Sequence, residues 1–151
     1  MDLAPDFDEF IESLIAHGVE FVVVGAYALA FHGAPRFTGD LDVLIRPTPE
    51  NGARVLAALR DFGFPAPALQ PADLADTRRM LQMGVEPVQI RVMGAISGVT
   101  WDAAWSDRVT GRLGRHDVAF LGRETFLRNK RAAARPKDLA DIDALREGDP
   151  E

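Results

Sequence analysis

The stretch of residues 19–46 constrains the fold more than any other part of the chain. It begins with VEFVVV, an apolar run of β-branched and aromatic side chains that stops at Gly25 and predicts a buried strand. The following AYALAFHG predicts a short helix that ends at Gly33. After a turn-rich segment, DLDVLIR at 40–46 predicts a second strand that stops before Pro47. Strands and helices therefore alternate closely along this part of the chain.

The remaining elements follow the same alternation. Apolar residues at helical spacing predict a first helix at 5–18, and Thr48 and Gly63 mark the cap and the end of another. Further segments comprise predicted helices at 71–83, 100–108, 124–134 and 136–147, a third strand at 86–93 and a hairpin at 109–121. This order predicts a mixed α/β (α+β) fold with a mixed central β-sheet flanked by helices. We expect a single domain over 1–151, since no internal repeat or linker interrupts the chain.

Composition narrows the classes of function. The absence of cysteine excludes disulfides, thiolate metal sites and cysteine nucleophiles. A formal net charge of −6 argues against non-specific binding to nucleic acid, because that binding needs many cationic side chains in contact with phosphates. A small anionic ligand would need a local positive field from metal ions or from a few well-placed Lys and Arg.

The sequence predicts a cytoplasmic protein with no membrane segment. The amino terminus, MDLAPDFDEF, lacks the basic and apolar regions of a secretion signal. The longest apolar run, residues 21–31, is about half of the roughly 20 residues that a membrane-spanning helix requires.

Two carboxylates in the second predicted strand are candidate metal ligands. Because side chains alternate across a strand, Asp40 and Asp42 leave the same face about 7 Å apart along the backbone. Two acids this close repel each other unless a cation or a proton lies between them. A pair of oxygen ligands suits Mg²⁺ or Mn²⁺.

The first strand supplies a candidate phosphate site. Where VEFVVV runs into a helix, Gly25 and Ala26 leave backbone N–H groups and a positive dipole end at the carboxyl end of the strand. If the two strands are neighbours, this end faces Asp40 and Asp42. Together they would form a site for a metal-bound nucleotide.

The segment VVVGAYALAFHGAPRFTGDLDVLI resembles the signature region of the nucleotidyltransferase superfamily, which has the DNA polymerase β-like fold. It is similar above all to small bacterial members related to abortive-infection and toxin–antitoxin nucleotidyltransferases. The matching residues are Gly25, Arg36, Thr38, Asp40 and Asp42. Less specific similarity continues through AISGVTWDAAW and LRNKRAAARPKDLADIDAL, so the resemblance covers most of the chain.

The resemblance implies an activity and roles for residues. Asp40 and Asp42 would hold Mg²⁺ or Mn²⁺ against a nucleoside triphosphate, and an acceptor hydroxyl would attack the α-phosphorus to release pyrophosphate. The acceptor would be an RNA, a protein or a small molecule. Because 151 residues leave little room for a separate acceptor-binding domain, we expect the acceptor to dock on a partner protein or on a second copy in a homo-oligomer. The implied nucleotide-binding residues are Gly25, Ala26, Arg36, Thr38, Lys130 and Lys137, and Arg135 could add positive charge. Arg36 and Thr38 also fit a role in bracing the loop, and the cations also fit a solvated face.

One departure from the family pattern leaves two functions open. The family places a third carboxylate on an adjacent strand, and alignment through ISGV puts Arg91 at that position. A guanidinium cannot ligate a metal ion, and it could instead bond Asp40 and Asp42. The first function is metal-dependent nucleotidyl transfer, with the missing acid supplied by Glu86, Asp102, Asp138 or Asp141. The alternative is a catalytically degenerate protein that acts as a binding or toxin–antitoxin component.

Overall fold

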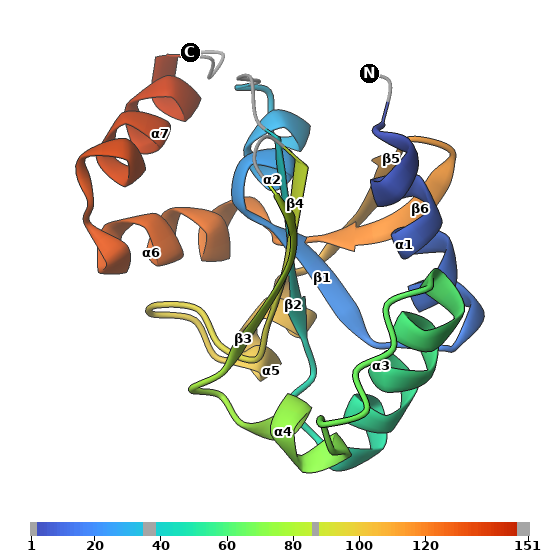
Figure 1. Ribbon diagram of the computed structural model, residues 1–151. Helices are drawn as coiled ribbons and strands as arrows, with labels where there is room; N and C mark the ends of the chain where they lie inside the picture. Colours follow the sequence, from blue (N-terminus) through green and yellow to red (C-terminus); the bar gives the residue numbers. More distant parts are fainter. Residues whose placement is uncertain (1–2, 35–38, 86–87, 148–151) are drawn as a thin grey trace.

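The computed structural model describes residues 3–34, 39–85 and 88–147, which form a mixed sheet with helices on both faces (Figure 1). The helices are α1 (Pro5–Ala16), α2 (Gly25–Phe31), α3 (Pro49–Phe62), α4 (Pro71–Ala75), α5 (Trp101–Asp107), α6 (Arg123–Ala133) and α7 (Pro136–Glu147). The strands are β1 (Phe21–Val24), β2 (Asp40–Ile45), β3 (Met80–Val85), β4 (Val88–Met93), β5 (Val109–Leu113) and β6 (His116–Phe120). The predicted fold class is confirmed.

The strand order is β3-β4-β2-β1-β6-β5. It places β1 and β2, the two strands that flank α2, at the centre of the sheet. β1 runs antiparallel to β2, and β2 runs parallel to β4. The outer strands β3 and β5 pair antiparallel with β4 and β6. Because β1 and β2 are antiparallel neighbours, Val24 at the end of β1 lies opposite Asp42 near the start of β2.

The two faces of the sheet have different partners. In β2, Leu41, Val43 and Ile45 point to one face and are buried. α1 and α3 cover one side of the sheet, whereas α6 and α7 lie on the other side (Figure 1). Asp40 and Asp42 leave β2 on the face opposite to Leu41 and Val43.

Most predicted elements are confirmed, and one is wrong. Thr48 caps α3 by accepting a hydrogen bond from the backbone N–H of Asn51, and Gly63 ends the helix with a φ of 92°. The helix predicted at 71–83 is instead the single short α4 followed by edge strand β3. The helix ends because Asp76 accepts hydrogen bonds from Arg78, which makes a turn, and β3 is stabilised by its pairing with β4. Within the described part of the chain, no helix has the length and apolar character needed to cross a membrane.

The buried amide of Asn51 joins α3 to the ends of the two central strands. Its Oδ1 accepts from the backbone N–H of Glu20 at 2.9 Å. Its Nδ2 donates to the carbonyl oxygens of Glu20 and Arg46, each at 3.0 Å. These bonds satisfy backbone groups beyond the strand ladders and fix the helix against the sheet.

Gly25 is required by the way β1 turns into α2 beside β2. Its φ of +67° lies in the left-handed region of backbone conformation. Residues other than glycine adopt this region at a cost of about 1 kcal/mol. A Cβ added at this position would lie 2.5 Å from Oδ2 of Asp42. The glycine therefore serves both the turn and the close approach of the Asp42 carboxylate.

Replacing Gly25 with alanine should destabilise the fold more than the same change at Gly18. Gly18 has nearly the same φ, +66°, and a Cβ there would meet no atom within 4 Å. We expect Gly18→Ala to lower the free energy of unfolding by about 1 kcal/mol and Gly25→Ala by clearly more, because Asp42 must also move. Urea denaturation of both variants measures the difference, and equal losses would show that the Asp42 contact is unimportant.

Candidate functional site

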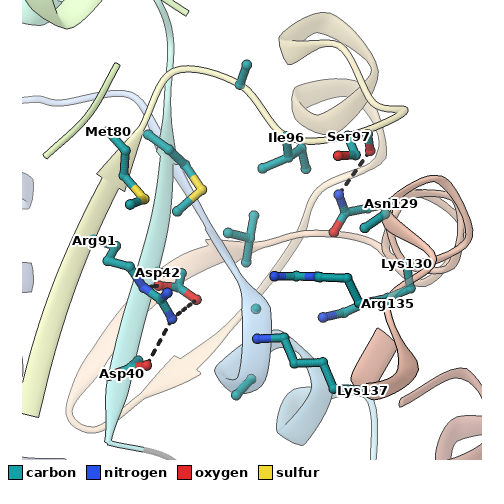
Figure 2. A pocket seen from close by; sticks show the side chains of 16 residues that line it. Asp40, Asp42, Met80, Arg91, Ile96, Ser97, Asn129, Lys130, Arg135 and Lys137 are labelled. Carbon is teal, nitrogen blue, oxygen red and sulfur yellow. Dashed lines mark hydrogen bonds and ion pairs between the residues drawn. The ribbon is translucent and has the colours of Figure 1, made fainter. Parts of the chain in front are cut away.

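A pocket of about 690 Å³ opens on the face of the sheet that carries Asp40 and Asp42, between β2–β4 and the helices α6 and α7 (Figure 2). This volume is within the range of small-molecule sites, about 300–1,000 Å³. Two carboxylates line it, those of Asp40 and Asp42. The cationic groups that line it are more numerous: Arg91, Lys130, Arg135 and Lys137. Gly25 and Ala26 also line it.

The guanidinium of Arg91 bonds both carboxylates. Its Nε donates to Oδ1 of Asp42 at 2.8 Å, and its Nη2 donates to Oδ2 of Asp40 at 2.9 Å. Nη2 also lies 3.5 Å from Oδ2 of Asp42. The side chains are mostly shielded from water, with exposed fractions of 27% for Arg91, 23% for Asp40 and 15% for Asp42. Figure 2 shows the guanidinium between the two acids.

Strand register explains this contact. β4 lies parallel beside β2, and Asp42 is paired with Arg91 while Asp40 is paired with Gln89. Paired residues of neighbouring strands point to the same face, so the side chain of Arg91 emerges beside Asp42 and reaches Asp40. The sequence-based expectation that residue 91 faces the two acids is confirmed.

The pKa of the Asp42 carboxyl group is raised despite this partner. Burial raises its pKa, and the nearby Asp40 adds to the rise, whereas Arg91 and the more distant Lys137 oppose it. The balance leaves the pKa above its usual value. The carboxylate would therefore be stabilised by additional positive charge in the pocket.

The acids as arranged do not fit a divalent ion. Oxygen atoms of both Asp40 and Asp42 are bonded by Arg91, which offers only N–H donors. Across residues 3–34, 39–85 and 88–147, no group of three or more His, Asp or Glu side chains could hold a metal ion. Magnesium requires nearly octahedral oxygen ligands, so a metal could bind here only after the guanidinium moved away.

A buried ionic network forms the wall opposite the sheet. Lys130 of α6 lies 3.2 Å from both Oδ1 of Asp138 and Oδ2 of Asp141, which belong to α7. Asp138 also accepts from the backbone N–H of Arg135 at 3.1 Å and from its Nε at 2.7 Å. Burial alone would raise the pKa of Asp138, but hydrogen bonds from Arg135 and Lys130 outweigh it and lower the pKa to about 2.

The predicted site residues fall into three groups. The pocket brings together Gly25, Ala26, Asp40, Asp42, Lys130, Arg135 and Lys137. Arg36, Thr38 and Glu86 lie outside the described residues. Asp138 and Asp141 support Lys130, and Asp102 belongs to α5 and does not line this pocket.

Sequence reasoning missed several pocket residues. Met80, Met93, Ile96, Ser97 and Asn129 also line the cavity. Alternation along β4 places Met93 on the face of Arg91 in the sequence, although it was not assigned to a site, and Met80 was assigned to a helix. The contact between Asn129 of α6 and Ser97 joins residues that are distant in the sequence and leaves no local pattern in it.

The network around Asp138 should make stability depend on acidity. The folded pKa lies near 2 and the usual value is 3.8, so the ionised carboxylate stabilises the fold above pH 4. We expect about 2 kcal/mol of unfolding free energy to be lost as the pH falls from about 4 to about 2. Denaturation at a series of pH values should show this loss in the wild type and a smaller one in Asp138→Asn.

Asp143→Asn, at an exposed position of the same helix, controls for the removal of one negative charge. If Asp138→Asn and the wild type lose stability in parallel below pH 4, the network does not hold Asp138 ionised.

No known family model matches this sequence, and no curated protein matches it significantly. Solved structures do match. A Thermotoga maritima protein provisionally assigned as a nucleotidyltransferase superposes with a TM-score of 0.55 and 13% identity, over 93% of this chain and 88% of its own. The lincosamide antibiotic adenylyltransferase LnuA, with lincomycin bound, superposes with a TM-score of 0.57 and 9% identity, over 98% and 99% of the two chains. These superpositions cover almost the whole chain, which therefore has the nucleotidyltransferase fold.

Proposed function

We propose that this protein binds a nucleoside triphosphate in the pocket and that Arg91 takes the place of a divalent cation on Asp40 and Asp42. It then acts through binding, as a catalytically degenerate protein with the nucleotidyltransferase fold. The observation that carries the proposal is the guanidinium of Arg91 bonded to both acids. Such an internal cation makes the two carboxylates compatible with an anionic ligand without a metal ion.

The phosphates would lie against the cations on the α6–α7 side. Lys137 is exposed and lines the pocket, whereas Lys130 and Arg135 are already engaged with Asp138. Gly25 and Ala26 line the same space and add little bulk. Lys137 is therefore the cation that a phosphate can recruit at least cost to the fold.

Metal-dependent nucleotidyl transfer is the second candidate. The placement of Asp40 and Asp42 on one face of β2 favours it, because two carboxylates there outnumber the single guanidinium of Arg91. In this alternative Asp40 and Asp42 hold Mg²⁺ or Mn²⁺, and a nucleoside monophosphate passes to a hydroxyl of an RNA, a protein or a small molecule. It is consistent with the adenylyltransferase LnuA, which this chain matches along its length.

Calorimetry with ATP separates the two candidates. We expect the wild type to bind ATP in EDTA as well as in millimolar Mg²⁺, and Lys137→Ala to weaken binding about tenfold through loss of a charge-assisted hydrogen bond. Arg131→Ala removes an exposed cation of α6 that does not line the pocket and serves as the control. Binding that requires Mg²⁺, or pyrophosphate release that disappears in Asp40→Asn, would support transfer instead.

Restoring an acid at position 91 should create a metal site. We expect Arg91→Asp to be less stable than the wild type without metal, because three neighbouring carboxylates then repel one another. Mg²⁺ or Mn²⁺ should raise the melting temperature of the variant by several degrees and leave the wild type unchanged. Arg91→Asp combined with Asp42→Asn should lose most of the response.

Differential scanning fluorimetry with and without metal measures these shifts. A wild type that Mg²⁺ stabilises as strongly as Arg91→Asp would mean that Arg91 leaves the acids readily, and the proposed role of Arg91 would be wrong.

A further inference from the structure

The two edges of the sheet differ in how they are protected. Among the strands of the described residues, β3 and β5 are the outermost. β5 includes the charged Arg112, whose Nε lies 3.3 Å from Oδ1 of Asp117, and the ring of Phe31 packs against its Gly111. Charged side chains and covering groups are the usual means by which a protein keeps an edge strand from pairing with another chain.

β3 has neither kind of protection in its own sequence. The strand reads MLQMGV and contains no Lys, Arg, Asp, Glu or Pro. Met80 at its start is 52% exposed, and Val85 at its end is 78% exposed. Its main contacts with other helices and strands are those with β4. The backbone N–H and C=O groups on the outer side of β3 are therefore available to a further strand.

The register with β4 determines which side chains of β3 share a face. Gln82 is paired with Arg91, and Met83 is paired with Ile90. Paired residues point to the same face, so Gln82 lies on the face of the pocket, whereas Leu81 and Met83 lie on the opposite face. Gln82 is exposed and Met83 is buried.

This pattern makes β3 complementary to a second copy of itself. When two identical strands pair antiparallel about a two-fold axis perpendicular to the sheet, one residue lies opposite its own copy. With Gln82 at the axis, Leu81 lies opposite Met83 of the partner subunit, which joins two apolar side chains. An amide carries both a donor and an acceptor, so Gln82 can hydrogen-bond to its own copy, whereas two like charges there would repel.

We propose that β3 pairs antiparallel with β3 of a second copy, so that the protein forms a symmetric dimer with one continuous sheet. Because the two-fold axis is perpendicular to the sheet, the pockets of both copies open on the same face. Met80 of β3 lines the pocket, so the second copy lies next to the rim of the pocket. This dimer goes beyond the proposed nucleotide binding and does not depend on it.

Single cysteine variants test which residues face each other, because the natural chain has no cysteine. Paired Cα atoms of antiparallel strands are about 4.5–5.5 Å apart, which a disulfide can bridge. We expect Gln82→Cys to form a disulfide-linked dimer about tenfold faster than Thr110→Cys in the same mild oxidant, because the dimer holds the two thiols together. Thr110 is exposed on the other edge strand, β5, and serves as the control. Non-reducing gel electrophoresis measures both rates.

Sedimentation equilibrium measures the dimer without a cross-link. We expect the mass of the wild type and of Thr110→Lys to approach twice that of one chain as the concentration rises through the micromolar range. Gln82→Lys should stay monomeric, because two ammonium groups would meet at the axis. An equimolar mixture of Gln82→Lys and Gln82→Glu should recover the dimer, because opposite charges then meet.

The results also define failure. A wild type that stays monomeric throughout this range, or Gln82→Cys that cross-links no faster than Thr110→Cys, would overturn the proposal and leave the edge to a strand of a different protein. A mixture of the two charged variants that stays monomeric would overturn the placement of Gln82 at the axis. The cysteine comparison introduces no charge into the sheet, so it decides the question even if Gln82→Lys fails to fold.

Discussion

The guanidinium of Arg91 between Asp40 and Asp42 is the interaction on which the rest of the site depends. Two carboxylates on one face of a central strand repel each other, and here the opposing positive charge comes from the neighbouring strand of the same chain. Because the pair is mostly shielded from water, loss of the guanidinium would leave costly charges behind. A fold that elsewhere supports nucleotidyl transfer is thus organised around an internal cation.

Three local features place this interaction in the wall of the pocket between the sheet and α6 and α7. The parallel pairing of β2 and β4 sets residue 91 opposite residue 42. Gly25 lets the β1–α2 turn pass beside the carboxylate of Asp42. Ala134 then adopts a left-handed conformation, with a φ of 53°, where α6 gives way to α7, which lets the two helices pack on each other. Each feature depends on one or two residues, which is why small changes there should alter the pocket.

The parts of the fold that follow from local patterns could be predicted from the sequence. The β1–α2–β2 segment is marked by apolar periodicity and by glycines, and alignment through ISGV to the family pattern placed Arg91 at the position that faces the two acids. β3 was not predicted because it is an edge strand whose residues are mostly exposed and also suit a helix. The burial of Lys130 beside Asp138 depends on how α6 packs on α7, so the sequence suggested a solvated face instead.

The buried location of the Lys130–Asp138–Asp141 network also sets how the pocket responds to ionic strength. Mobile ions screen exposed charges over about 8 Å in physiological salt, but they reach buried pairs far less. Surface contacts such as Arg115 with Glu12 should weaken as salt is added, whereas the α6–α7 wall keeps its shape. A salt-dependent affinity would therefore report the charge of the ligand and of Lys137, and not a collapse of the cavity.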